Sequence, residues 1–271
     1  MTSIAAVGQT NLHEHKLFRV LRTVYEMMLD RHYDVPEALI APTYDDFVRM
    51  YIREEEVLVE RERIHALEGA NLHIVRDDAN ENTVVVRKRV IMRNRMTLPC
   101  TRDLSATASS AADAMAAAGD AAAAGKSTAL VLFCPPHDLT GKNLQSHVSL
   151  AENDGCRLLV LVTPSKPNAI VKKYIDNLNR GPAGGLKVEL FEEDDLAVNI
   201  TRHELVPRHV PLTPEQTREV LQAHALEVHQ LPRLLATDPV ARYFGLTRGN
   251  VVRIERRSES AGVYASYRQV V

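Results

Sequence analysis

The sequence predicts a protein of two parts: an α/β N-terminal domain, in which helices flank a mixed sheet, and a small α+β C-terminal domain. Strand and helix patterns alternate between residues 128 and 191, which is typical of a sheet with a parallel portion. The patterning changes near residue 197, and a chain of 271 residues is long enough for two hydrophobic cores. We therefore expect the N-terminal domain over 1–197 and the C-terminal domain over 198–271.

The N-terminal domain begins with an amphipathic helix. Apolar residues from Leu17 to Leu29 recur at helical spacing and form one stripe. Thr43, followed three residues later by Asp46, resembles a capping box and predicts the start of a short helix. Two strands are expected after it, at 72–75 and 83–92, joined by a polar turn.

A low-complexity, alanine-rich stretch at 105–124 interrupts these patterns. It buries little apolar area per residue, so we expect an insertion near 93–126 that is either a surface helix or a disordered loop. Regular structure resumes with strands at 128–134, 157–163 and 187–191, and the stretches between them have helical spacing. This order predicts a sheet with a parallel portion that helices cover.

The C-terminal segment has its own helix and strand signals. Thr213 before Pro214, and Asp238 before Pro239, each combine an N-cap residue with proline at the first helical position. The second helix is expected to end at Gly245. The segments 250–257 and 263–271 then alternate as two strands with a turn between them.

Composition limits the function classes. The formal net charge is −2, whereas a protein that holds nucleic acid by itself usually has a basic total. No run approaches the length of about 18 apolar residues that a membrane span needs, and the N-terminus lacks the layout of a signal peptide. Three unpaired cysteines favour a reducing, intracellular compartment. From residue 198 onward there are ten arginines, no lysine and seven acidic residues, which leaves three net positive charges.

Two short motifs resemble functional sites but depart from the required spacing. His203 and His209 are six residues apart with Pro207 between them, whereas a zinc-protease helix needs two histidines four residues apart. The stretch 121–128 contains Gly-Lys-Ser, but the strand follows this segment and does not precede it as in a phosphate-binding loop. We expect no metal, no cofactor and no catalytic residue.

The segments NITRHELVPRHVPLT and QLPRLLATDPVARYFGLTRGNVVRIERRSESAGVYASYR strongly resemble the C-terminal domain of the fifth subunit of eukaryotic RNA polymerases. A small archaeal RNA polymerase subunit is similar over the same region. The resemblance covers 198–271 and implies an assembly module that docks on the largest polymerase subunit. A small rigid domain presents side chains suited to such an interface, and we expect the contacts from Arg233, Arg242, Tyr243, Phe244, Arg248, Arg253 and Arg268. Each arginine could equally form an ion pair within the domain.

The N-terminal domain resembles the same family in the order of its elements. In that family it forms a jaw beside downstream DNA, and a loop with a Thr-Pro-Ser string approaches the duplex. Thr163, Pro164 and Ser165 form this string here, with Lys166 after it. Short hydroxyl residues at a strand end suit backbone contact with duplex DNA, although a generic turn is the alternative.

The resemblance thus implies a non-catalytic subunit of a nuclear, DNA-dependent RNA polymerase. The other polymerase subunits would be its partners, and it would contact downstream duplex DNA only within the complex. Two alternatives come from other classes: a free-standing DNA-binding transcription regulator, and a degenerate nuclease-like domain. The net charge of −2 disfavours the first, and the absence of a recognisable carboxylate–lysine cluster disfavours the second.

Overall fold

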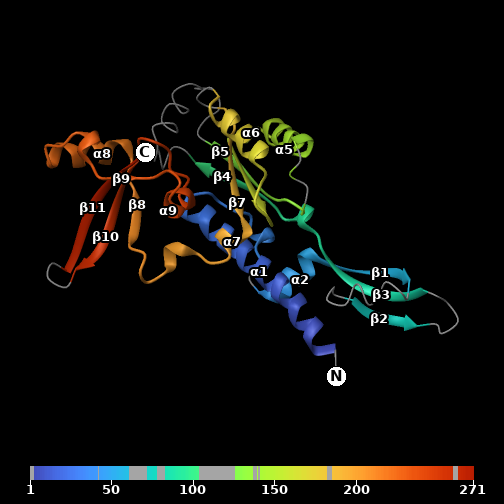
Figure 1. Cartoon of the computed structure of the whole chain (residues 1–271). Coiled ribbons are helices and arrows are strands. Elements are labelled where there is room, and N and C mark those ends of the chain that lie inside the picture. Colours follow the sequence, from blue (N-terminus) through green and yellow to red (C-terminus); the bar gives the residue numbers. More distant parts are fainter. Residues whose placement is uncertain are drawn as a thin grey trace.

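The computed structural model describes residues 3–41, 43–60, 72–77, 83–103, 126–136, 139, 141–181, 185–258 and 262–271. A central sheet and its helices form the body of the molecule, and two further sheets lie on either side of it (Figure 1). Within the described residues, no helix combines the length and the apolar character needed to cross a lipid bilayer.

The central sheet has four strands in the order β4-β5-β6-β7. They are β4 (Thr97–Asp103), β5 (Lys126–Phe133), β6 (Leu158–Thr163) and β7 (Lys187–Glu192). The last three strands are parallel, and β4 is antiparallel to β5. Helix-containing connections link the parallel strands, as such crossovers require. The predicted α/β domain with a mixed sheet is confirmed.

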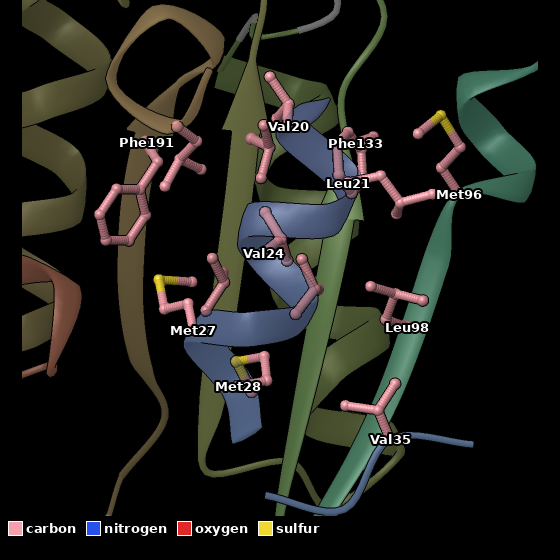
Figure 2. Close-up of a cluster of buried hydrophobic side chains, with 14 of the residues drawn as sticks. Val20, Leu21, Val24, Met27, Met28, Val35, Met96, Leu98, Phe133 and Phe191 are labelled. Carbon is pink, nitrogen blue, oxygen red and sulfur yellow. The ribbon is translucent and has the colours of Figure 1, made fainter. Parts of the chain in front are cut away.

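Helices cover both faces of this sheet. Helix α1 (Ser3–Asp30) packs on one face, and α5 (Gly141–Asn153) with α6 (Ala169–Asn179) packs on the other. Val160 and Val162 belong to the core under α1, whereas Leu159 and Leu161 belong to the core under α5 and α6. Successive side chains of a strand point to opposite faces, so β6 contributes to both cores. Figure 2 shows the apolar stripe of α1 against residues of the sheet, as its spacing predicted.

A three-stranded antiparallel sheet extends from the body near the N-terminal half of α1 (Figure 1). Its order is β1-β3-β2, with β1 (Ile52–Glu60), β2 (Leu72–Asp77) and β3 (Thr83–Ile91). Strand β1 follows α2 (Tyr44–Tyr51), whose N-cap Thr43 accepts from the backbone N–H of Asp46, as predicted. The basic run of β3 lies directly opposite the acidic run of β1. Cross-strand pairs of opposite charge stabilise such sheets.

The region expected as an insertion is only partly described. Residues 93–95 form a 3₁₀ turn, and 97–103 form β4, so this part belongs to the central sheet. The alanine-rich stretch at 105–124 lies outside the described residues.

The C-terminal domain is a four-stranded sheet with short helices, in the order β8-β10-β11-β9. Its elements are β8 (Arg208–Pro211), α8 (Pro214–Ala223), β9 (Arg233–Leu234), α9 (Pro239–Tyr243), β10 (Val251–Ser258) and β11 (Gly262–Val270). A capping box between Thr213 and Gln216 begins α8, and the Asp238 carboxylate accepts two backbone N–H groups at the start of α9. This confirms the predicted small α+β fold. The short connections are α7 (Glu193–Leu196) and the 3₁₀ turns Glu37–Leu39, Ile200–Arg202 and Val228–Gln230.

Candidate nucleic-acid and partner interfaces

The predicted DNA-contacting residues lie in the turn that follows β6, at the carboxyl edge of the parallel strands. Thr163 is 1% exposed, and its hydroxyl lies 3.0 Å from the carbonyl oxygen of Ser165 and 3.4 Å from that of Phe191. Pro164 is half-buried, whereas Ser165 and Lys166 are exposed. Thr163 therefore shapes the turn, and only the later residues present polar groups to solvent.

Charged residues hold the neighbouring α7 in place beside this turn. Arg93 and Glu193 form an ion pair in which both side chains are at most 5% exposed, and Lys16 pairs with Asp194. The Lys16 ammonium lowers the pKa of the Asp194 carboxyl, first by hydrogen bonding and then by its charge, and Lys166 adds a smaller effect of the same sign. The turn at 163–166 thus follows β6 and lies beside α7, which these ion pairs join to Arg93 and to α1.

Three of the seven residues predicted at the partner interface remain available on the surface of the C-terminal domain. Arg233 and Arg248 are exposed, Arg268 is half-buried, and none of them forms an ion pair within the described residues. Their backbones are neighbours, because Arg233 pairs in register with Gln269 and the N–H of Gly249 donates to the carbonyl of Val270. Arg253 instead forms an ion pair with Glu255 at 2.7 Å.

The other three predicted interface residues contact the N-terminal domain of the same chain. Tyr243 is 3% exposed and belongs to the hydrophobic core beneath α1, against which Phe244 also packs. The guanidinium of Arg242 lies over the ring of Phe191, 4.8 Å from its centroid, and donates to the carbonyl of Leu190 at 2.8 Å. It also pairs with Asp195 at 3.3 Å. All three side chains therefore make contacts within the chain, although Arg242 and Phe244 are only half-buried.

The C-terminal end of α9 meets Arg31, a buried arginine directly after α1, and we call this region the interdomain contact. Arg31 donates from Nε to the carbonyl of Tyr243 and from Nη2 to that of Arg242, each at 2.7 Å, while its Nη1 pairs with Glu189 at 2.8 Å. Lys187 donates to the carbonyl of Gly245 at 3.0 Å. The last carbonyls of a helix carry partial negative charge, and the Arg31 guanidinium binds those of Arg242 and Tyr243 at the end of α9.

The fold strongly shifts the pKa values of two groups in the interdomain contact, the Glu189 carboxyl and the Tyr243 phenol. Burial disfavours the ionised form of Glu189, but the charges of Arg31 and Lys187 outweigh it and lower the pKa of that carboxyl to about 2. Burial also raises the pKa of the Tyr243 phenol, with a further contribution from its hydrogen bond to the Asp30 carboxylate at 2.8 Å. Both groups are therefore fixed in one charge state near neutral pH, which suits a structural role.

The two histidines of the motif contact the backbone nearby: His203 lies in an exposed turn, and His209 is a half-buried residue of β8. Nδ1 of His203 accepts from the N–H of Leu205, and Nδ1 of His209 lies 2.7 Å from the carbonyl of Pro207. Among the described residues, no three His, Cys, Asp or Glu side chains gather into a group that could hold a metal ion.

Comparison with known protein families gives two matches that follow each other along the chain. The model of the RNA polymerase Rpb5 N-terminal domain matches residues 11–149, which is more than half of the sequence, and that of the Rpb5 C-terminal domain matches 198–270. The chain belongs to the Rpb5 family. The first Rpb5 match includes α1, the antiparallel sheet and the first two strands of the central sheet, and the second includes every element of the C-terminal domain.

Curated relatives are also named as RNA polymerase subunits. The chain is 47% identical over 120 residues to "DNA-directed RNA polymerases I, II, and III subunit RPABC1" of Caenorhabditis elegans and of Caenorhabditis briggsae, covering 44% of this chain and 54% of each relative. It is 51% identical over 86 residues to the Dictyostelium discoideum protein of that name, covering 32% of this chain and 44% of the relative. The matched region thus spans about half the length of these Rpb5 relatives.

Sequence reasoning missed the buried ionic residues of the interdomain contact. Arg31 and Glu189 are 4% and 13% exposed at their side chains, although charged residues usually lie at the surface. One sequence signal could have suggested the contact. The charged pair Asp30-Arg31 comes directly after the apolar stripe of α1, where the helix ends.

Proposed function

We propose that this chain is a non-catalytic subunit of a nuclear DNA-directed RNA polymerase. The observation that carries the proposal is the succession of the two Rpb5 domain matches in family order along one chain. The fold agrees with it, because two smaller sheets extend from the central body and offer separate surfaces to partners (Figure 1). The contribution of such a subunit to transcription is geometry and binding, while the complex performs the chemistry.

The proposal is tested by affinity isolation of the tagged chain from nuclear extract at moderate salt, with identification of the proteins that accompany it. We expect the largest subunit and other polymerase subunits in the eluate. Recovery of the chain alone would contradict the proposal and would favour a free-standing transcription regulator. Since the relatives are named for polymerases I, II and III, the identity of the recovered largest subunits also distinguishes a shared subunit from a dedicated one.

Within the complex, we propose that the C-terminal domain docks on the largest subunit through Arg233, Arg248 and Arg268. Arginine at an interface forks onto carboxylates and loses little hydration, and these side chains have no ion-pair partner among the described residues. Replacing all three with glutamate should strongly reduce co-purification, because interface arginines are frequent hot spots worth about 2 kcal/mol or more. The control is Arg256→Glu with Arg257→Glu, two exposed arginines of β10 outside this group.

We further propose that the exposed end of the turn at 163–166 contacts the backbone of downstream DNA. Ser165 and Lys166 can donate to phosphate oxygens without reading sequence. The variant Ser165→Asp with Lys166→Glu should weaken crosslinks to downstream DNA in the assembled polymerase. Loss of the Lys166 contact should lower the salt slope of binding by about 1.

A matched control makes the same change of charge elsewhere on the surface, on a helix. Ser149→Asp with Lys142→Glu alters two exposed residues of α5 by the same net charge. Crosslinking should be preserved in this control, and subunit recovery should be unchanged in both variants. Equal crosslinking of the two variants would refute the DNA contact while leaving membership of the complex intact.

A further inference from the structure

We propose that the interdomain contact locks the two domains into one rigid unit. Two domains of a chain normally move relative to each other unless the interface between them is large and apolar. Here Tyr243 at the end of α9 enters the core of the N-terminal domain, and the buried Arg31 guanidinium binds the carbonyl oxygens of Arg242 and Tyr243. The inference goes beyond membership of a polymerase, because it concerns the isolated chain.

The apolar part of the argument is continuity of the core. Tyr243 belongs to the same buried cluster as Val20, Val24 and Met27 of α1, and Phe244 packs against this cluster. The two rings contact each other edge to face, with centroids 5.2 Å apart. Movement of the C-terminal domain away from α1 would expose both rings to water, which opposes it.

The polar part fixes the angle between the domains. The Arg31 guanidinium donates from Nε and Nη2 to two backbone carbonyls of the C-terminal domain, and its Nη1 lies 2.8 Å from Oε2 of Glu189 in an ion pair. A planar fork with three engaged nitrogens tolerates little rotation of its partners. Because Arg31 and Glu189 are buried, separation of the domains would leave an ion pair without the carbonyls that complete its coordination.

A second set of bonds surrounds the phenol of Tyr243. Its hydroxyl donates to the Asp30 carboxylate at 2.8 Å and accepts from Asn199 at 3.1 Å. Asn199 also donates to Glu26 of α1 at 2.7 Å, so the segment that joins the domains is itself bonded to the N-terminal domain. Hydrogen bonds therefore hold both the segment around Asn199 and α9 to the N-terminal domain, so the C-terminal domain cannot rotate freely about the connection.

Gly245 makes the close approach of Arg31 feasible. It has a φ of +65°, and a side chain there would meet Cζ and Nη1 of Arg31 at 3.1 Å. The N–H of Gly245 donates to the carbonyl of Arg242, and that of Leu246 donates to the carbonyl of Ala241, which is the Schellman ending of a helix. This ending turns the carbonyls of α9 toward α1, where Arg31 binds them.

The test measures rotational tumbling of the two domains by backbone ¹⁵N relaxation on the isolated full-length chain. We expect one common correlation time for the wild type, and loss of this common value in Arg31→Met, with the smaller domain tumbling faster. Arg49→Met is the matched control, since Arg49 lies on α2 outside the interdomain contact, is 81% exposed at its side chain and pairs with Asp46 on the same helix.

Arg242→Met provides the same test from the other domain, with less risk to folding. Its side chain is 36% exposed, and its contacts are to Leu190, Phe191 and Asp195 of the N-terminal domain. For Arg242→Met we expect a small difference between the correlation times of the two domains. The difference should be clear in the Arg242→Met, Tyr243→Phe double variant. If Arg31→Met does not fold, this pair of substitutions decides the question.

Two results would overturn the proposal: separate correlation times in the wild type, or a common value that survives in the Arg242→Met, Tyr243→Phe double variant. Neither result depends on polymerase partners. Failure of the rigid unit and failure of the proposed function are therefore distinguishable.

Discussion

Replacement of Gly245 by alanine probes the interdomain contact at its tightest point. Gly245 has a φ of +65°, and a Cβ atom would meet Arg31 at 3.1 Å and the Glu189 carboxylate at 3.3 Å. A left-handed conformation costs an alanine roughly 1–2 kcal/mol. The displaced guanidinium would weaken charge-assisted hydrogen bonds worth about 1.5–3 kcal/mol. Together these effects predict a loss of about 2.5–5 kcal/mol in the free energy of unfolding.

Gly155→Ala is the matched control for this substitution. Gly155 has a φ of +66°, and nothing lies within 4 Å of the position its Cβ would take. It should therefore lose only the conformational part, about 1–2 kcal/mol. Urea unfolding of both variants, followed by far-ultraviolet circular dichroism, gives the comparison. The reasoning is refuted if Gly245→Ala is no more destabilising than Gly155→Ala.

Three further predictions concern a buried ion pair, a buried hydroxyl and a helix cap. The fold lowers the pKa of Glu189 to about 2, so the stability contributed by its ionised form is complete above about pH 4.5 and is lost as the pH falls toward 2. Glu189→Gln should therefore flatten the pH dependence of the urea midpoint between these two pH values. Tyr243→Phe should cost about 1–3 kcal/mol by calorimetry, whereas exposed Tyr264→Phe should stay within about 0.5 kcal/mol. Thr213→Ala should lower the thermal midpoint by removing a capping box worth about 1 kcal/mol.

Elements with strong local signals could be predicted from the sequence. The apolar stripe of α1, the caps at Thr43, Thr213 and Asp238, and the three parallel strands of the central sheet appear where their patterns place them, whereas β4 lies within the expected insertion and was not predicted. Each depends on a period or on a side chain that bonds its own neighbouring backbone, so a short window of sequence contains the necessary information.

Pairings between distant segments could not be predicted in this way. The acidic residues of β1 resemble a solvated charge run, and only the opposing β3 gives Glu56 its partner, Arg87, at 2.9 Å. Likewise, the aromatic and basic residues of 242–244 have the composition of an interface. Composition cannot tell a second domain of the same chain from another subunit, and the structure engages them within the chain.

The proposed membership of a nuclear RNA polymerase is tested most directly by a stoichiometry. The quantity is the ratio of the tagged chain to the largest polymerase subunit in a purified assembly. Native mass spectrometry of the affinity-isolated, size-fractionated complex gives this ratio. The account predicts that the chain elutes with the polymerase at one copy per largest subunit. Elution as a free protein, without polymerase subunits, would contradict it.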